Sequence, residues 1–269
     1  MPELPEVETV RRTLEQLILH KKIVAIKVLY APIIEDDQET FVSSLAGRTF
    51  QEIDRMGKYL IFKMDDIAFI SHLRMEGKFL ICQAQDPISK HVHLIFELDD
   101  GRELRYHDTR KFGRMKLCDH DNYRQELPLS KLGPEPFDAA LDEVYSRFKR
   151  KSVAIKTALL DQTILAGIGN IYANEICYSM HLDPRTPANR LSKKRVNELL
   201  LIASEILNSA IDQGGTTIHS FSSNGIDGLF QVQLKVHLAS SCPLGHDIKK
   251  IMINGRGTYY CPVCQRKRR

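Results

Sequence analysis

No segment of this 269-residue chain reaches the roughly 18 consecutive apolar residues that a membrane-spanning helix requires. The acidic start also lacks the basic and apolar regions of a secretory signal peptide. Internal repeats and low-complexity tracts are absent too, which argues against a solenoid or a disordered chain. We therefore expect a cytoplasmic protein that makes no use of a membrane.

Cysteine is scarce, with six residues in the whole chain. Cys82, Cys118 and Cys177 are scattered among apolar residues and are expected in the core. The other three crowd the C-terminus, a pattern more typical of a metal site than of disulfides.

The chain also has little excess of one charge sign, because its net charge is only +4. It is unevenly distributed: residues 139–269 carry 18 Lys and Arg against 10 Asp and Glu, and residues 1–138 carry 20 against 24. The basic second half predicts a surface for a polyanion, although solvated helix faces would give the same excess. The length and the 43% hydrophobic content favour two domains.

The first half of the chain is rich in predicted strands. It opens with an amphipathic helix from Pro5 to Leu17, in which Val7, Val10, Leu14 and Leu17 recur at helical spacing. Within 91–98, apolar residues alternate with His91, His93, Ile95 and Glu97, as in a half-buried strand. Strands are expected at 23–29, 59–64, 67–73, 78–82, 91–98 and 103–107, and they predict a β-sandwich.

The pattern becomes helical after the proline-rich segment 127–136, which we interpret as a domain boundary. Beyond it the spacing of apolar residues predicts helices near 139–150, 154–163, 170–180 and 192–213. Short strands around Ile251 and Tyr259, joined by Asn254 and Gly255, predict a terminal β-hairpin.

The second residue carries the first chemical signal. Proline after Met1 predicts removal of the initiator methionine, which leaves the secondary amine of Pro2 as the N-terminus. An α-amino group titrates near pH ~8 against ~10.4 for lysine, so part of it is an unprotonated nucleophile at neutral pH. Glu3 beside it can shuttle protons. The alternative is that proline merely begins a helix.

A glycine-rich turn at 165–170 (LAGIGN) lies between two predicted helices. We expect Asn170 to cap the second of them, and amide groups at such a helix start can hold a phosphate. Lys151 and Lys156 lie just upstream, on the same basic side.

The C-terminal cysteines have the spacing of a metal knuckle. Cys261 and Cys264 form a Cys-x-x-Cys pair that can share one zinc ion, with Cys242 and His246 as the other ligands. A disulfide from Cys242 to Cys261 or Cys264 is an alternative. So is a hairpin held by apolar packing of Ile248, Ile251, Ile253 and Tyr259.

Six ordered motifs run through the chain: PELPEVET (2–9), GKYL (57–60), HLRM (72–75), KFG (111–113), GIGNIY (167–172) and GRGT (255–258) with the following Cys-x-x-Cys. Together these segments resemble the formamidopyrimidine-DNA glycosylase family over essentially the whole chain. The resemblance implies an α+β fold: a β-sandwich with its opening helix over 1–131, a helix-two-turn-helix domain over 132–233, and a zinc-finger hairpin over 234–269. It also implies duplex DNA in the cleft between domains.

The family's activity would be that of a bifunctional DNA glycosylase and AP lyase, acting on 8-oxoguanine and formamidopyrimidines. By the resemblance Pro2 attacks C1′ of the damaged nucleoside and forms a Schiff base, with Glu3 as acid and proton shuttle. Lys58 would assist sugar opening and elimination. Arg256 would hold a phosphate and promote the later step of a β,δ-elimination.

The family everts the damaged base and fills the vacated space with side chains. By the resemblance these are Met75, a flexible filler, Arg110, a partner for the orphaned base, and Phe112, a wedge. The DNA backbone would be contacted by His91, Lys151, Asn170 and Lys156.

This chain departs from the family pattern in two places. The finger usually has two Cys-x-x-Cys pairs, whereas here the first is broken. His219 and Phe221 stand in the lesion-covering loop where the family more often has Arg and Tyr. We expect a bacterial monomer, associated with the nucleoid when on DNA. The rival interpretations are an endonuclease VIII-like glycosylase for oxidised pyrimidines and a DNA-binding finger protein without catalysis.

Overall fold

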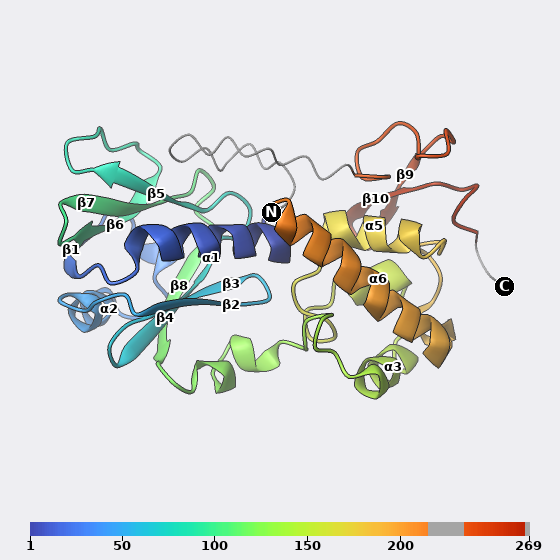
Figure 1. The fold of residues 1–269 in the computed structure, drawn as a ribbon, viewed down its shortest axis with the longest axis horizontal. Helices are drawn as coiled ribbons and strands as arrows, with labels where there is room; N and C mark the ends of the chain where they lie inside the picture. The colour runs from blue at the N-terminus through green and yellow to red at the C-terminus, as the bar shows by residue number, and fades with distance from the viewer. Residues whose placement is uncertain (215–233, 267–269) are drawn as a thin grey trace. The chain divides into compact units, whose positions relative to one another are not determined.

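The computed structural model describes residues 1–214 and 234–266, and Figure 1 shows the course of the chain. No helix in these ranges is both long and apolar enough to cross a membrane. The helices are α1 (Leu4–Ile18), α2 (Gln38–Leu45), α3 (Leu141–Lys149), α4 (Ile155–Leu159), α5 (Asn170–Ser179) and α6 (Lys193–Asp212). The strands are β1 (Ile23–Val28), β2 (Glu52–Met56), β3 (Tyr59–Lys63), β4 (Ile67–His72), β5 (Lys78–Gln83), β6 (Val92–Leu98), β7 (Arg102–His107), β8 (Arg114–Asp119), β9 (Lys249–Ile253) and β10 (Arg256–Tyr260).

The described residues form two compact units. The first contains Met1–Pro2 and Glu6–Ser130, and the second contains Glu3–Pro5, 131–214 and 234–266. The chain therefore passes between the units at its very start and again within the proline-rich segment. A separate third part beginning at residue 234 stays a proposal.

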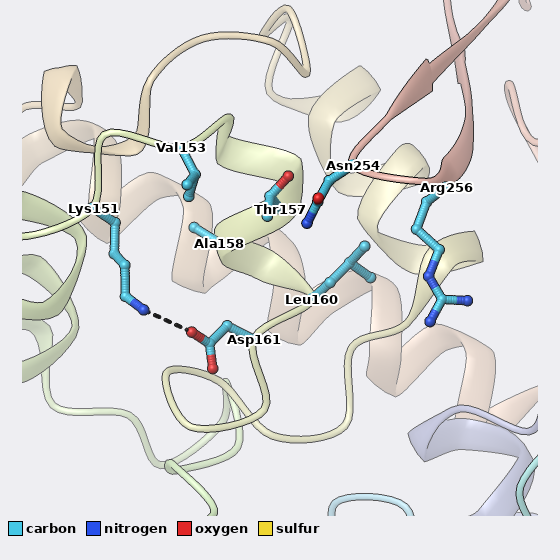
Figure 2. A pocket seen from close by; sticks show the side chains of 8 residues that line it. All are labelled: Lys151, Val153, Thr157, Ala158, Leu160, Asp161, Asn254 and Arg256. Carbon is cyan, nitrogen blue, oxygen red and sulfur yellow. Dashed lines mark hydrogen bonds and ion pairs between the residues drawn. The ribbon is translucent and has the colours of Figure 1, made fainter.

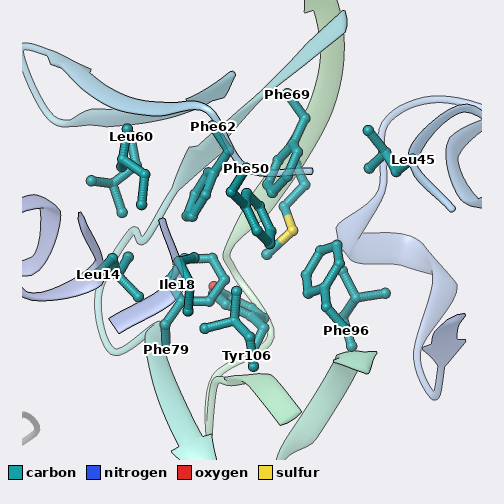
Figure 3. Packing of buried hydrophobic residues seen from close by; sticks show 14 of the residues in the cluster. Leu14, Ile18, Leu45, Phe50, Leu60, Phe62, Phe69, Phe79, Phe96 and Tyr106 are labelled. Carbon is teal, nitrogen blue, oxygen red and sulfur yellow. The ribbon is translucent and has the colours of Figure 1, made fainter. Parts of the chain in front are cut away.

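The first unit is a β-sandwich, as predicted. Its two antiparallel sheets have the strand orders β1-β6-β7-β5 and β2-β3-β4-β8. One apolar cluster takes side chains from both sheets, and Figure 3 shows its packing. Phe69 of β4 stacks on Phe62 of β3 at 4.5 Å between ring centroids and on Phe96 of β6 at 5.6 Å. Stacked rings of this kind join one sheet to the other.

Helix α1 packs its apolar stripe onto the same cluster. Val7, Val10 and Leu14 are buried as predicted, but the stripe ends on Ile18, and Leu17 is only partly buried. On its polar side Glu8 forms ion pairs with Arg11, Arg12 and Arg55 at 2.9–3.0 Å. The pair with Arg55 holds the helix to β2, since Arg55 belongs to that strand.

The expectation that β6 is half-buried was wrong. His93 and Ile95, on the face opposite the core, are buried as well. His93 Nε2 lies 2.7 Å from the carbonyl oxygen of Asp108, and its ring packs against Tyr30. Coverage by neighbouring loops buries this face, and strand periodicity cannot predict such coverage. Strands β2 and β8 and helix α2 were also not predicted.

A buried ion pair explains part of this second covered face. Arg105 and Glu103 of β7 are 1% and 3% exposed, and their charged groups meet at 2.6 Å. Arg105 also donates to the carbonyl oxygens of Gln83, Asp86 and Pro87. Each guanidinium nitrogen therefore has a partner: Nε donates to Glu103, and the two terminal nitrogens hold the loop after β5 onto the sheet.

The second unit is mainly helical. Helix α6 buries the predicted stripe, with Val196, Leu199, Ala203 and Leu207 fully buried. Helix α4 is shorter than the predicted 154–163. It ends at Leu159 because the Asp161 carboxylate accepts the amide hydrogen of Thr163 and starts a turn.

The C-terminal hairpin forms as predicted from strands β9 and β10. Asn254 and Gly255 both have positive φ, 46° and 72°, as a two-residue hairpin turn requires. All six cysteines are free. Cys118 and Cys177 are buried as expected, but Cys82 is partly exposed, because β5 is an edge strand of its sheet.

A histidine in the sheet β2-β3-β4-β8 has an unusual environment. His72 of β4 pairs with Tyr59 of β3 and packs edge-on against its ring at 4.5 Å. Burial, followed by the charges of Arg74 and Lys58, lowers the pKa of His72 to about 3. The neutral ring accepts the amide hydrogen of Arg74 at Nδ1, at 2.9 Å.

This pKa predicts an acid-sensitive fold. The unfolded chain binds a proton at His72 below pH ~6.5, whereas the folded chain stays neutral to about pH 3, so stability falls as pH falls. Between pH ~6.5 and ~5 the loss from this group is about 2 kcal/mol. His72→Asn keeps an acceptor for Arg74 but does not titrate, so its free energy of unfolding should fall less over this range. Denaturant unfolding followed by circular dichroism at several pH values tests this, and parallel curves for the two proteins would refute it.

Candidate functional site

The Glu3 side chain is fixed at the start of helix α5. One carboxylate oxygen accepts from the amide of Gly169 at 2.7 Å and of Tyr172 at 3.3 Å, and the other accepts from Ile171 at 2.8 Å. Glu3 is only 2% exposed. A helix start favours a negative charge through its free N–H groups and its dipole. These hydrogen bonds fix the position of the Glu3 carboxylate, and Glu3 directly follows Pro2 in sequence.

The glycines of the 165–170 turn are needed for this contact. A Cβ at Gly169 would lie 2.3 Å from Cδ of Glu3, and one at Gly167 would lie 2.4 Å from a methyl carbon of Leu4. Gly167 also has a φ of +92°, and its carbonyl oxygen accepts from the amide of Leu4 at 3.1 Å. The turn is therefore shaped to receive the N-terminal residues.

The expectation that Asn170 caps α5 was wrong. Gly169 occupies the cap position, and the carboxylate of Glu3 binds the free amides in place of a local side chain. Asn170 is the first helical residue, and its Nδ2 donates to the carbonyl oxygen of Gly257 at 3.1 Å. The capping group is distant in sequence, so local pattern could not reveal it.

Lys156 binds the same carbonyl oxygen. Its Nζ donates to Gly257 at 3.0 Å and to Oγ1 of Thr258 at 2.8 Å. The residue is fully buried, and that burial lowers the pKa of Lys156 to about 8. The structure thus places Lys156 inside the second unit rather than on an open basic face. Together with Asn170 it holds β10, and so Arg256, against α4 and α5.

Lys151 and Arg256, far apart in sequence, line one pocket (Figure 2). The pocket has a volume of about 420 Å³, and both residues bring a positive charge to it. Nζ of Lys151 pairs with the Asp161 carboxylate at 3.0 Å, and Arg256 is exposed. None of the other residues that line the pocket was predicted to belong to a site; they are Val153, Thr157, Ala158, Leu160, Asp161 and Asn254 of the hairpin turn.

The four predicted metal ligands come together. The ligand atoms of Cys242, His246, Cys261 and Cys264 all lie within 4.8 Å of one another. Cys242 Sγ is 3.9 Å from Cys264 Sγ, and His246 Nδ1 is 3.5 and 3.4 Å from these two sulfurs. Tetrahedral bonds of ~2.3 Å to sulfur and ~2.0 Å to nitrogen give edges of about 3.5 to 3.8 Å. The cluster can therefore hold one metal ion.

The hairpin has little packing of its own to replace such an ion. Ile248, Ile251, Ile253 and Tyr259 are only partly buried. The small apolar cluster at Cys242 and Cys261 also needs Tyr178 of α5 and Val236.

The remaining predicted residues lie in the first unit. Lys58 is 6% exposed and follows Gly57 in the tight turn between β2 and β3. Pro2 is buried, whereas Met1 is exposed. His91 is partly exposed, with its ring 5.5 Å from that of His107.

Met75, Arg110 and Phe112 occupy two loops beside the sandwich. Arg110 and Phe112 are exposed and Met75 is partly exposed, so all three reach solvent. The guanidinium of Arg110 lies 4.8 Å from the Phe112 ring centroid. His219 and Phe221 lie outside the described residues.

Two family models match this chain. The formamidopyrimidine-DNA glycosylase N-terminal domain matches residues 1–115, and the H2TH domain of the same glycosylase matches residues 132–222. Curated relatives named formamidopyrimidine-DNA glycosylase include one from Bacillus subtilis, 45% identical over 100% of both chains. Another, from Ligilactobacillus salivarius, is 44% identical over 98% of this chain and 99% of the relative.

Solved structures agree with these matches. A Lactococcus lactis FPG mutant bound to Fapy-dG containing DNA has a TM-score of 0.93 and 39% identity, covering 99% of this chain and 100% of that one. The Lactococcus lactis Fpg bound to DNA with an abasic site has a TM-score of 0.91 and 39% identity, covering 98% and 100%.

Proposed function

This chain belongs to the formamidopyrimidine-DNA glycosylase family, and we propose that it is a bifunctional DNA glycosylase and AP lyase of base excision repair. Its substrates are oxidised purines in duplex DNA, chiefly 8-oxoguanine and formamidopyrimidines. The observation that carries the proposal is the position of the Glu3 carboxylate, which accepts hydrogen bonds from three amides at the start of α5. Glu3 directly follows Pro2 in sequence.

In the proposed reaction the amine of Pro2, freed by removal of Met1, attacks C1′ of the damaged nucleoside. The C1′–N bond breaks, the base leaves with a proton, and the sugar opens to a Schiff base on Pro2. Glu3 supplies and receives protons at the sugar. Amide hydrogen bonds keep its carboxylate oriented, so little motion is needed between these steps.

Lys58 and Arg256 serve the sugar and its phosphates. Lys58, at the β2–β3 turn, assists sugar opening and elimination. Arg256 holds a phosphate of the elimination step, and the pocket it shares with Lys151 offers two cationic groups for the DNA backbone. Asn170 and Lys156 act indirectly, since their side-chain donors bind the hairpin at Gly257. His91, in the first unit, contacts the DNA backbone.

The exposed Met75, Arg110 and Phe112 suit the space left by an everted base. A flexible apolar chain, a hydrogen-bonding cation and an aromatic wedge together replace stacking and pairing. The relatives' names favour this purine-directed activity over the endonuclease VIII-like alternative. Retention of Pro2, Glu3 and Lys58 argues against a protein without catalysis.

Zinc is the metal we propose for the Cys242, His246, Cys261 and Cys264 cluster. Three thiolates and one imidazole form an ordinary closed tetrahedral site, which stabilises a fold and does no chemistry. We propose three domains, at 1–131, 132–233 and 234–269. The last is counted as a separate domain because the metal would stabilise it. We also propose a monomer in the bacterial cytoplasm, on the nucleoid when bound to DNA.

Borohydride trapping tests the reaction. Sodium borohydride reduces a Schiff base to a stable amine, so the protein should become linked to an 8-oxoguanine duplex, with the adduct at Pro2 after loss of Met1. Glu3→Gln should trap on a duplex with a preformed abasic site but far less on 8-oxoguanine, because base release needs the acid. Pro2→Gly should trap weakly, since a glycine amine still attacks. An adduct on an internal lysine, or undiminished trapping by Pro2→Gly, would exclude Pro2 as the sole nucleophile.

Metal content tests the finger. Purified protein should contain one zinc per chain, and His246→Ala should lose or weaken it, whereas His246→Cys should retain it. Because the hairpin lacks its own core, loss of zinc should disorder the Arg256 turn and reduce DNA binding. Hydrogen exchange should then increase in 249–260 while α1 stays protected. A zinc-free protein with full lyase activity would contradict the zinc role and favour packing or a Cys242 disulfide.

A further inference from the structure

Two loops carry the side chains proposed to fill the vacated space: the Met75 loop (residues 73–77) and the Phe112 loop (residues 108–113). We propose that Asp108 and Tyr106 are positioning residues that join these loops into one preformed wedge. The inference rests on the proposed function of Met75, Arg110 and Phe112. It assigns a role to two buried polar residues that the proposed chemistry does not use.

Asp108 orders the Phe112 loop. Its carboxylate accepts the amide hydrogens of Arg110, Phe112 and Gly113 at 2.9, 2.9 and 2.8 Å. The residue is 0% exposed. Three hydrogen bonds to one buried carboxylate fix the backbone on both sides of Lys111, whose φ of +59° is unfavourable for a side-chain-bearing residue.

Tyr106 joins this loop to its neighbour. A Cβ at Gly113 would lie 1.6 Å from the Tyr106 hydroxyl oxygen, and one at Gly77 would lie 2.2 Å from it. The last residue of each loop is therefore a glycine packed on the same hydroxyl. Strand pairing explains why Tyr106 lies beside Gly77. Tyr106 of β7 is opposite Phe79 of β5, and Phe79 is two residues after Gly77.

The hydroxyl also lies beside Asp108. Burial, followed by the charge of the Asp108 carboxylate, raises the pKa of Tyr106, so the phenol stays protonated next to that carboxylate. The hydroxyl that packs on Gly77 and Gly113 is therefore adjacent to the group that orders the Phe112 loop.

A second link closes the junction at the surface. Oγ1 of Thr109, in the Phe112 loop, donates to the carboxylate of Glu76, in the Met75 loop. The Met75 loop is also held by its own contacts, from the Arg74 amide to His72 and from the Gly77 amide to the Leu73 carbonyl oxygen.

The tips of the wedge are arranged in advance as well. The Arg110 guanidinium lies over the Phe112 ring, and the Lys111 ammonium lies 4.4 Å from the Tyr30 ring centroid. Loops ordered without DNA lose little conformational entropy on insertion. Insertion and eversion should therefore be fast in the wild type and slow when the loops move separately.

The test compares Asp108→Asn with Asp119→Asn in the full-length zinc-loaded enzyme. Asp119 is the matched control, because its carboxylate accepts the amides of Asp121 and Asn122 in another loop of the sandwich. Asp108→Asn should slow single-turnover excision of 8-oxoguanine opposite cytosine about tenfold or more. Borohydride trapping on a preformed abasic duplex, which needs no base eversion, should change less than threefold. Asp119→Asn should change neither.

Two further measurements separate positioning from stability. Arg110 is the proposed partner of the orphaned base, so Asp108→Asn should reduce the preference for cytosine over adenine opposite the lesion, which lost stability alone would not do. Tyr106→Phe removes the hydroxyl on which both glycines pack, so it should excise 8-oxoguanine more slowly while abasic trapping changes less than threefold. In a Phe112→Ala background the effect of Asp108→Asn should shrink, because both act through one loop.

The outcomes distinguish this inference from the proposed function. If the wild type neither excises 8-oxoguanine nor traps, the proposed function fails. If the wild type excises and Asp108→Asn matches it in rate and in opposite-base preference, the positioning role is refuted. Equal losses in excision and abasic trapping, together with a lower unfolding temperature, would also refute it.

Discussion

The contact on which the proposed site depends is the one between the Glu3 carboxylate and the start of helix α5. It joins residues 166 to 169 positions apart in sequence. Because the helix start has free amides and a positive dipole end, it stabilises a buried carboxylate. Gly167 and Gly169 leave the space that this contact requires. The orientation of the N-terminal residues is thus fixed by the helical unit.

The same helix also helps to position Arg256 in the pocket that it lines together with Lys151. Asn170, at its first turn, and Lys156, in α4, bind one carbonyl oxygen of β10 and so place Arg256 at the pocket with Lys151. The Cys and His cluster brings together residues that precede and follow the hairpin. The Glu3 carboxylate and the strand that carries Arg256 both bind the start of α5, so the proposed roles of these two residues depend on the same helix. Hydrogen bonds between residues distant in sequence make these contacts.

Much of this could be predicted from the sequence, for physical reasons. Alternation and helical spacing predicted the sandwich and α6, and the Asn254-Gly255 turn predicted the hairpin, because these signals are local. The Cys and His residues that come together beside the hairpin were predicted from their spacing. The cap of α5, the buried Lys156 and the Asp108 and Tyr106 junction could not be predicted, because each depends on a partner brought near only by folding. The covered face of β6 was missed because loop packing leaves no periodic signal.

The most direct test of the account is Gly169→Ala. The added Cβ would lie 2.3 Å from the Glu3 carboxyl carbon, so it must displace that side chain from the helix start. We expect single-turnover excision of 8-oxoguanine to fall about a hundredfold, with zinc content unchanged and affinity for lesion DNA within about threefold, since a displaced acid loses its transition-state role. Excision at the wild-type rate in a folded, zinc-loaded Gly169→Ala protein would contradict the central role of this contact.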